Sequence, residues 1–204
     1  MDWYGWQISF GTPANFKNKR DVAEECLALS LEARFPTDYT DVYEHLFGNE
    51  DYLICMLYNY DGDIMGYSIF ANLKEIDMLY LHGIVLHPIA QGKGFSKGMI
   101  EAAIKYVNPK FLSARTHNPR MFETLSSFAS DTESYYPNVS TDEIPAEIYQ
   151  LVGNNKFTAK AEEWLIVRNA YPDEKLAQSF KNQNIAKIFG RLKPNDAQVI
   201  VVRL

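Results

Sequence analysis

One segment of the sequence, from Met78 to Val107, constrains the fold more than any other. It opens with a nearly continuous apolar run, Met78 to Leu86, which is typical of a central β-strand. His87-Pro88 ends this run, and a glycine-rich stretch from Gln91 to Gly98 follows it. The apolar residues after the glycines recur at helical spacing: Ile100, Ala103, Ile104 and Val107. The segment therefore predicts a strand, a tight turn and a helix in immediate succession.

The chemistry of this turn suits a ligand that contains phosphate. Gly92 and Gly94 lack Cβ, so the backbone can turn sharply there and come close to an anion. The predicted helix adds unpaired N–H groups and the positive end of its dipole, and Lys93 and Lys97 add charge. The glycine spacing, which includes Gly98, fits neither the Walker A pattern nor G-x-G-x-x-G. Taken alone, the glycines favour a tight strand-to-helix connection without any ligand.

The chain before this segment predicts two helices and three strands. Strands are expected at Trp3–Phe10, Tyr52–Tyr60 and Ile64–Ala71, the last two joined by a turn at Asp61-Gly62-Asp63. A first helix carries apolar residues at helical spacing and stops before Pro36: Val22, Cys26, Leu29 and Ala33. A second, short helix is expected at Asp41–Leu46.

The chain after this segment alternates short strands and helices. Strands are predicted at Phe111–Ala114, Trp164–Val167 and Gln198–Leu204. Asn118 and Pro119 predict a helix start, with a buried face of Met121, Phe122, Leu125 and Phe128. Another helix is expected to begin at Thr141 and close at Gly153, with helix and loop from Asp173 to Leu192. The order of elements predicts a mixed α/β (α+β) fold.

Composition narrows the class of protein. The 204 residues are 47% hydrophobic, which is enough for the core of one domain spanning residues 1–204. A net charge of −6 disfavours nucleic acid as a partner, and the absence of a long apolar run disfavours a membrane span. Cys26 and Cys55 are too few for a disulfide scaffold or a cysteine-rich metal site, and both are expected in the core. With no export signal at the N-terminus, we expect a cytoplasmic protein without a metal.

Two spaced motifs give the sequence a family resemblance. Residues Gln91 to Ser96 fit the pattern [QR]-x-x-G-x-[GA], except that Ser96 stands in the last position. Residues Ala114 to Pro119 resemble a strand-to-helix junction in which an Asn contacts coenzyme A. Together with the element order, these motifs resemble the Gcn5-related N-acetyltransferase (GNAT) superfamily over Trp3–Ala129 and the last strands. The resemblance implies a central, mostly antiparallel mixed sheet flanked by helices, and it leaves 130–160 and 173–194 unmatched.

The resemblance implies a binding site for acetyl-CoA. The backbone of Ile84, Val85 and Leu86 would pair with the pantetheine arm, and one N–H would stabilise the oxyanion formed when an amine attacks the thioester. Asn118 would contact the coenzyme further along. The residues that would hold the pyrophosphate, mainly through backbone amides, are Gln91, Gly92, Lys93, Gly94, Phe95, Ser96 and, by its charge, Lys97.

The resemblance also implies an acid and a base. His82 is the best candidate to take the proton of the acceptor amine, and Tyr80 lies on the same strand face. A half-buried histidine that only fills the sheet is an equally good interpretation of His82. Asp77 is a weaker candidate base. Ser126 stands where many family members place a Tyr acid; Tyr135, Tyr136, Tyr149 or water could take that role. The other histidines are expected to be structural (His87) or on the surface or in loops (His45 and His117).

We therefore expect an N-acetyltransferase that moves an acetyl group from acetyl-CoA to a primary amine. The acceptor would be a small amine or a protein amine, and the sequence does not identify it. Because Ser96 and Ser126 depart from the family pattern, a GNAT-like module that binds an acyl-CoA or a protein partner without catalysis is the alternative. The terminal strand and the aromatic content of 14% leave room for a homodimer.

Overall fold

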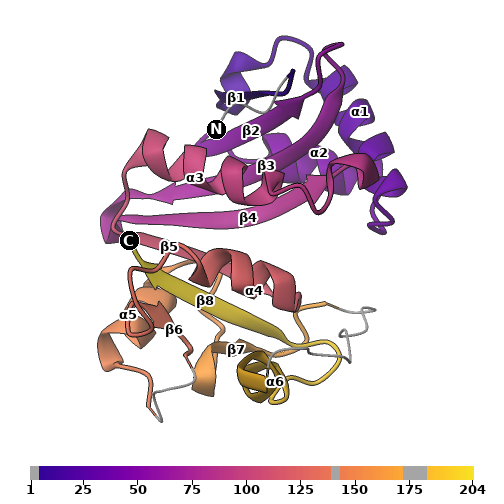
Figure 1. The fold of residues 1–204 in the computed structure, drawn as a ribbon. Coiled ribbons are helices and arrows are strands. Elements are labelled where there is room, and N and C mark those ends of the chain that lie inside the picture. The colour runs from indigo at the N-terminus through magenta and orange to yellow at the C-terminus, as the bar shows by residue number, and fades with distance from the viewer. Residues whose placement is uncertain (1–4, 139–142, 172–182) are drawn as a thin grey trace. The chain divides into compact units, whose positions relative to one another are not determined.

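A computed structural model describes residues 5–138, 143–171 and 183–204 (Figure 1). The chain forms two compact units. The first holds the residues up to Asn72 and Leu79–Asn108, and the second holds Leu73–Met78 and Pro109–Leu204. Among the described residues, none of the helices combines the length and the apolar character that crossing a membrane requires.

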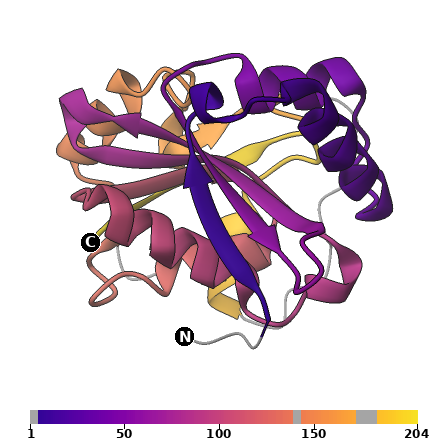
Figure 2. The same ribbon diagram turned by 90° about the horizontal axis from the view of Figure 1, so that it is seen from above.

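The first unit is a sheet with helices on both faces (Figure 2). Its strands lie in the order β1 (Gln7–Gly11), β2 (Tyr52–Tyr58), β3 (Ile64–Leu73) and β4 (Met78–Leu86). β1 and β2 pair antiparallel, as do β2 and β3. The helices are α1 (Lys19–Glu32), α2 (Tyr39–Phe47) and α3 (Phe95–Val107).

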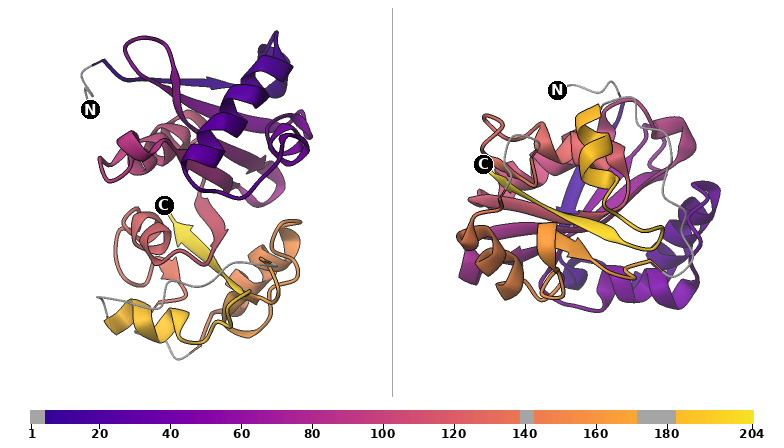
Figure 3. Two further views of the ribbon diagram at one scale, coloured as in Figure 1. Left: turned by 90° about the vertical axis from the view of Figure 1, so that its right-hand side faces the viewer. Right: turned by 90° about the horizontal axis from the view of Figure 1, so that it is seen from below.

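Side-chain contacts assign the helices to the faces of this sheet. Tyr67 of β3 shares a hydrogen bond of 2.8 Å with Ser30 of α1, which packs beside α2. Phe10 of β1, which pairs with Cys55, stacks on Tyr106 of α3 at 5.4 Å. Tyr67 pairs with Met56, so the two side chains share one face of the sheet. Cys55, the neighbour of Met56 on β2, points to the other face together with Phe10. The contacts of Tyr67 and Phe10 therefore lie on opposite faces of the sheet. Helices α1 and α2 therefore cover one face and α3 the other; Figure 3 (left) shows α1 in front of the strands.

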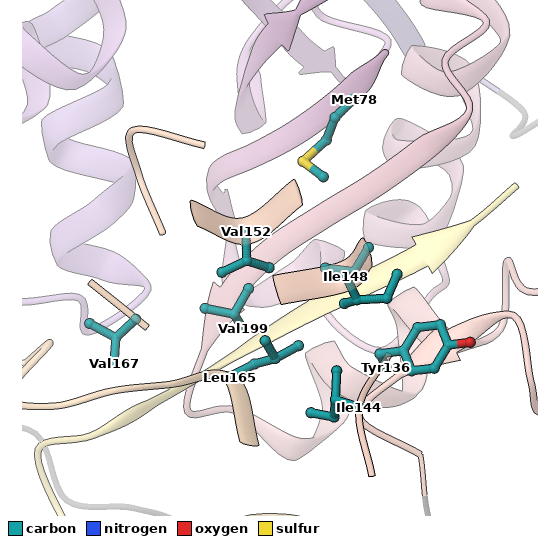
Figure 4. Packing of buried hydrophobic residues seen from close by; sticks show 9 residues of the cluster. Met78, Tyr136, Ile144, Ile148, Val152, Leu165, Val167 and Val199 are labelled. Carbon is teal, nitrogen blue, oxygen red and sulfur yellow. The ribbon is translucent and has the colours of Figure 1, made fainter. Parts of the chain in front are cut away.

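The second unit is organised around the terminal strand β8 (Ala197–Arg203). β5 (Phe111–Thr116), β6 (Tyr135–Tyr136) and β7 (Ile166–Val167) each pair antiparallel with β8, whose residues are buried up to Val202. The helices of this unit are α4 (Pro119–Ser126), α5 (Ala146–Asn154) and α6 (Gln183–Phe189). Buried apolar side chains from α5, β7 and β8 pack against one another (Figure 4): Ile148, Val152, Val167, Val199 and Val201.

The sequence-based expectations for the strands and helices match the structure best where local signals are strong. β4 has the predicted bounds, Gly62 adopts the positive φ of +89° that the hairpin turn requires, and Asn108 is the C-cap of α3. The mixed, mostly antiparallel α/β fold is confirmed. α5 differs from the prediction: it begins after Pro145 and contains Gly153, and its expected cap Thr141 lies outside the described residues. Half of Asp173–Leu192 lies outside them as well, and the described half contains α6.

Candidate active site

The C-terminal half of β4 is the most accessible part of the central strand. Residues 78–81 of this strand are buried, whereas residues 82–86 are all half-buried. A Cβ built on Gly83 would meet no heavy atom within 4 Å, so the space beside the strand is open there. This is the stretch that holds Ile84, Val85 and Leu86, whose backbone groups were predicted to pair with pantetheine.

The side-chain alternation of β4 breaks within this stretch. The ring of His82 lies 5.0 Å from that of His45 on α2, so His82 faces α1 and α2. Leu86 packs against Gly66. Gly66 pairs with Leu57, whose side chain points to the face covered by α3, so Leu86 lies on that face. Because residues an even number apart normally share a face, this arrangement indicates an irregularity between His82 and Leu86. Such an irregularity leaves backbone N–H and C=O groups out of the ladder and able to bind a ligand.

The turn after β4 forms a concave backbone surface at the start of α3. Gly92 and Gly94 have φ of +75° and +83°, which an L side chain adopts only with strain. A Cβ at either position would meet no heavy atom within 4 Å, so a ligand can approach the backbone. The Gln91 side chain donates to the carbonyl of Leu86 at 3.0 Å and ties the turn to the strand end. Gly94, the N-cap of α3, has no side chain to cap the helix, and a helix N-terminus favours an anion through its N–H groups and its dipole.

Aromatic and charged residues surround the turn. Phe95, the first residue of α3, is buried, and its ring lies 4.4 Å from that of Trp6. The Lys93 ammonium lies 5.9 Å from the centre of the Trp6 ring. Ser96 is half-buried and Lys97 is exposed on the first helical turn. The predicted pyrophosphate-binding residues, Gln91 to Lys97, are therefore together at one helix N-terminus with a net positive charge.

The predicted base lies in a cluster of aromatic rings. Around His82 lie the rings of His45, Tyr52 and Tyr80, at centroid distances of 5.0, 5.5 and 6.2 Å. Tyr52 and Tyr80 are buried, and burial raises the pKa of Tyr52, so its hydroxyl stays protonated at neutral pH. The sequence placed His45 on the surface or in a loop. In the structure His45 lies on α2 with 44% of its side chain exposed, and its ring stacks on that of His82.

The other titratable candidates of the sequence have structural partners. The Nε2 atom of His87 lies 2.7 Å from the carboxylate of Glu32 on α1, and its Nδ1 atom accepts a hydrogen bond from the Ile89 amide. Asp77, in the second unit, forms an ion pair of 3.2 Å with Lys110. Cys26 and Cys55 are fully buried, and burial raises the pKa of the Cys55 thiol to about 12. A buried, protonated thiol is a poor nucleophile, in agreement with the predicted core role.

The second unit holds the remaining predicted site residues. Asn118 is the N-cap of α4, as predicted, and accepts a hydrogen bond of 3.0 Å from the Arg120 amide. Ser126 ends the same helix and donates to the carbonyl of Glu123 at 3.2 Å.

The side chains considered as substitutes for Ser126 also lie in the second unit. The Tyr149 hydroxyl accepts from the Trp164 amide at 3.0 Å, Tyr136 is buried, and burial raises the pKa of Tyr135. The His117 ring lies 4.3 Å from the Tyr171 ring in this unit.

Comparisons with known proteins agree with this architecture. The model of the acetyltransferase (GNAT) family matches residues 20–124, which is just over half of the chain. No curated protein sequence matches. The ribosomal-protein-S18-alanine N-acetyltransferase from Escherichia coli is similar in structure, with a TM-score of 0.56 and 13% identity over 97% of this chain and 94% of that one. Tetrahymena GCN5 has a TM-score of 0.53 and 10% identity over 74% and 88% of the two chains.

Proposed function

Because this chain belongs to the GNAT family of acetyltransferases, we propose that it transfers an acetyl group from acetyl-CoA to a primary amine. One observation carries the proposal. The glycines Gly92 and Gly94, both with positive φ, lie at the N-terminus of α3, shortly after the half-buried residues 82–86 of β4. Accessible strand backbone followed directly by an anion site suits a ligand with a peptide-like arm and a pyrophosphate.

The residues of this chain would hold acetyl-CoA in two ways. Backbone groups of Ile84, Val85 and Leu86 would pair with the pantetheine arm, while the amides of Gln91–Ser96 and the charge of Lys97 would hold the pyrophosphate. Asn118 would contact the coenzyme further along. When bound, acetyl-CoA supplies the thioester from which the amine takes the acetyl group. A β4 N–H would donate to the carbonyl oxygen of that thioester.

His82 would remove the proton that an ammonium carries at neutral pH. An alkylamine has a pKa of about 10.4, so a base must generate its neutral, nucleophilic form. Histidine titrates near neutral pH, and His82 lies half-buried two residues before the proposed pantetheine-binding stretch. Buried Tyr80 would line the same path. The acceptor would be a small amine or an amine of a protein.

Calorimetric titration with acetyl-CoA, with ATP and NADH as controls, tests the binding site. We expect saturable binding of acetyl-CoA alone. His82→Gln should keep this affinity, because backbone groups make the proposed contacts, and should lose at least tenfold in amine-dependent thiol release. A protein that binds none of the three ligands would overturn the proposal.

A second function has one specific observation in its favour. The Ser126 hydroxyl donates within its own helix, so it does not replace the Tyr acid of other family members. A chain that binds acetyl-CoA but releases no thiol with any amine would be an acyl-CoA-binding module that acts through partners. Thiol release in a screen of small amines and lysine peptides separates the two functions.

A further inference from the structure

The side chain of His87 connects the end of β4 with the C-terminal end of α1 and with the turn that leads to α3. Its Nδ1 atom accepts a hydrogen bond of 3.2 Å from the Ile89 amide. Its Nε2 atom lies 2.7 Å from the carboxylate of Glu32, the last residue of α1. The backbone amide of His87 donates to the carbonyl of Met65 on β3 at 2.9 Å. One residue of the first unit therefore joins β3, α1 and the turn after β4.

The two ring contacts require one tautomer of His87. Because the Ile89 amide can only donate, Nδ1 must present a lone pair and not a proton. The proton of the neutral ring is then on Nε2, from which it is donated to the Glu32 carboxylate. The opposite tautomer would make neither hydrogen bond. The Glu32 carboxylate therefore stabilises the tautomer that accepts from Ile89, so the two contacts depend on each other.

The contact with Ile89 fixes the start of the proposed coenzyme-binding turn. His87 is the N-cap of a short 3₁₀ helix, Pro88–Ala90, which ends at Gln91. The Gln91 side chain returns to the carbonyl of Leu86 at 3.0 Å. Residues 86–91 are therefore closed by hydrogen bonds immediately before the glycines of the turn.

The turn that follows has little support from its own side chains. Gly92 and Gly94 leave the backbone free to adopt many conformations, and Gly94 offers no side chain to cap α3. A ligand that requires one conformation of such a turn binds more tightly when other contacts already hold it. The hydrogen bonds of residues 86–91 hold the N-terminal end of the turn in this way.

The place of Glu32 in the fold indicates a role in positioning. A carboxylate at the C-terminal end of a helix is disfavoured by the helix dipole. The Glu32 side chain is 60% exposed, and the pairing of so exposed a group adds little to stability. The same end of α1 is attached to the sheet by Ser30, whose hydroxyl shares a hydrogen bond of 2.8 Å with Tyr67. Glu32 therefore holds the His87 ring from a fixed point.

We propose that His87 is a positioning residue for acetyl-CoA, whose ring, held by Glu32, keeps the coenzyme-binding turn in the conformation that binds the pyrophosphate. This inference rests on the proposed function. The ring itself contacts no reacting atom, and its effect reaches acetyl-CoA through the Ile89 amide and the turn that follows. Loss of the ring contacts should therefore change the affinity for acetyl-CoA and leave kcat at saturating acetyl-CoA unchanged.

Two substitutions of His87 test this role by calorimetric titration with acetyl-CoA. His87→Leu removes the acceptor for the Ile89 amide, and we expect the affinity to fall about fivefold, which is typical of a lost N-cap. His87→Asn keeps an acceptor, because Asn is among the best N-cap residues, and should bind within about twofold of the native protein. Thiol release at saturating acetyl-CoA measures kcat. An equal loss of affinity in both variants would show that the cap on Ile89 is not what matters and would overturn the proposal.

Variants of Glu32 test the dependence on α1 at an exposed side chain. Glu32→Ala should weaken acetyl-CoA binding by about two- to fivefold, up to the full value of the cap. Glu32→Gln should restore the affinity, because its amide oxygen still accepts from Nε2. Combined with His87→Asn, Glu32→Ala should have no further effect, since the ring it holds is absent. Glu24→Ala, which removes a carboxylate of α1 that pairs with Arg20, is the matched control and should not change the affinity.

The same measurements separate this inference from the proposed function. If the native protein, His87→Leu and Glu32→Ala bind acetyl-CoA with one affinity, the positioning role is wrong and the acetyltransferase function stands. If Glu32→Ala still weakens binding when combined with His87→Asn, Glu32 acts without the ring and the proposed link between the two is wrong. If the native protein binds no acetyl-CoA, the function itself falls, and the positioning role falls with it.

Discussion

Substitution of Gly94 by Ala separates a ligand-binding turn from a turn that only connects β4 to α3. Gly94 has φ of +83°, and an added Cβ would meet no heavy atom within 4 Å, so the methyl group brings strain but no clash. An L residue in this conformation costs about 1–2 kcal/mol. A free turn can relax away from this strain. If acetyl-CoA requires the native turn, binding must restore it, which weakens the affinity by about 5- to 30-fold.

Gly62 supplies the matched control for this experiment. It has φ of +89° and equally open surroundings, but it lies in the β2–β3 hairpin. Gly62→Ala should therefore cost a similar free energy of unfolding and leave acetyl-CoA affinity unchanged. Urea denaturation measures the first quantity and calorimetry the second. Equal acetyl-CoA affinities for the two variants would show that the turn does not bind the coenzyme.

Two further predictions concern packing and charge. Gly66→Ala would place a Cβ 2.5 Å from Leu86 Cδ2 and 3.1 Å from the Val85 carbonyl oxygen. We therefore expect the free energy of unfolding, measured by urea denaturation, to fall by about 1–3 kcal/mol, and acetyl-CoA to bind more weakly. An unchanged free energy of unfolding would contradict this packing. For buried Asp196, desolvation raises the pKa, but hydrogen bonds from the Lys193 amide and Arg168 outweigh it and lower the pKa. Its contribution to stability is therefore present above the unfolded pKa of about 3.9 and is lost as pH falls through the lower folded value. Asp196→Asn should cost about 1–3 kcal/mol at pH 7 and less at pH 3; an equal loss at both pH values would contradict the assignment.

Local signals explain what the sequence could predict. The bounds of β4, the Gly62 turn and the Asn118 cap each depend on a few adjacent residues, and the structure has all three. The GNAT resemblance also depended on short motifs, at Gln91–Ser96 and Ala114–Pro119. Neighbouring residues within each motif determine the conformation, so one sequence is enough to predict it.

Contacts made by tertiary packing explain what the sequence could not predict. His45 lies on a short helix far from β4 in sequence, and only the packing of α2 on the sheet brings its ring to His82. The irregularity of β4 was hidden as well, because its apolar run has no period from which a change of face could be inferred. The one available hint for His45 was Asp41 four residues earlier, a spacing that places both on one helix face.

Ser126 raises the question of whether this site needs an acid for the departing thiolate. Its hydroxyl donates to the Glu123 carbonyl at 3.2 Å, so it serves its own helix. A thiol has a pKa of about 8.5, some two units below that of the attacking alkylamine at about 10.4, so a thiolate leaves more readily than the amine without being protonated first. Ser126→Ala should therefore leave kcat within about twofold of the native value at pH 7, and Ser126→Tyr should bring no large gain. Thiol release at saturating acetyl-CoA measures both. A tenfold gain in Ser126→Tyr would show instead that expulsion of the thiolate limits the native reaction and that an acid is missing.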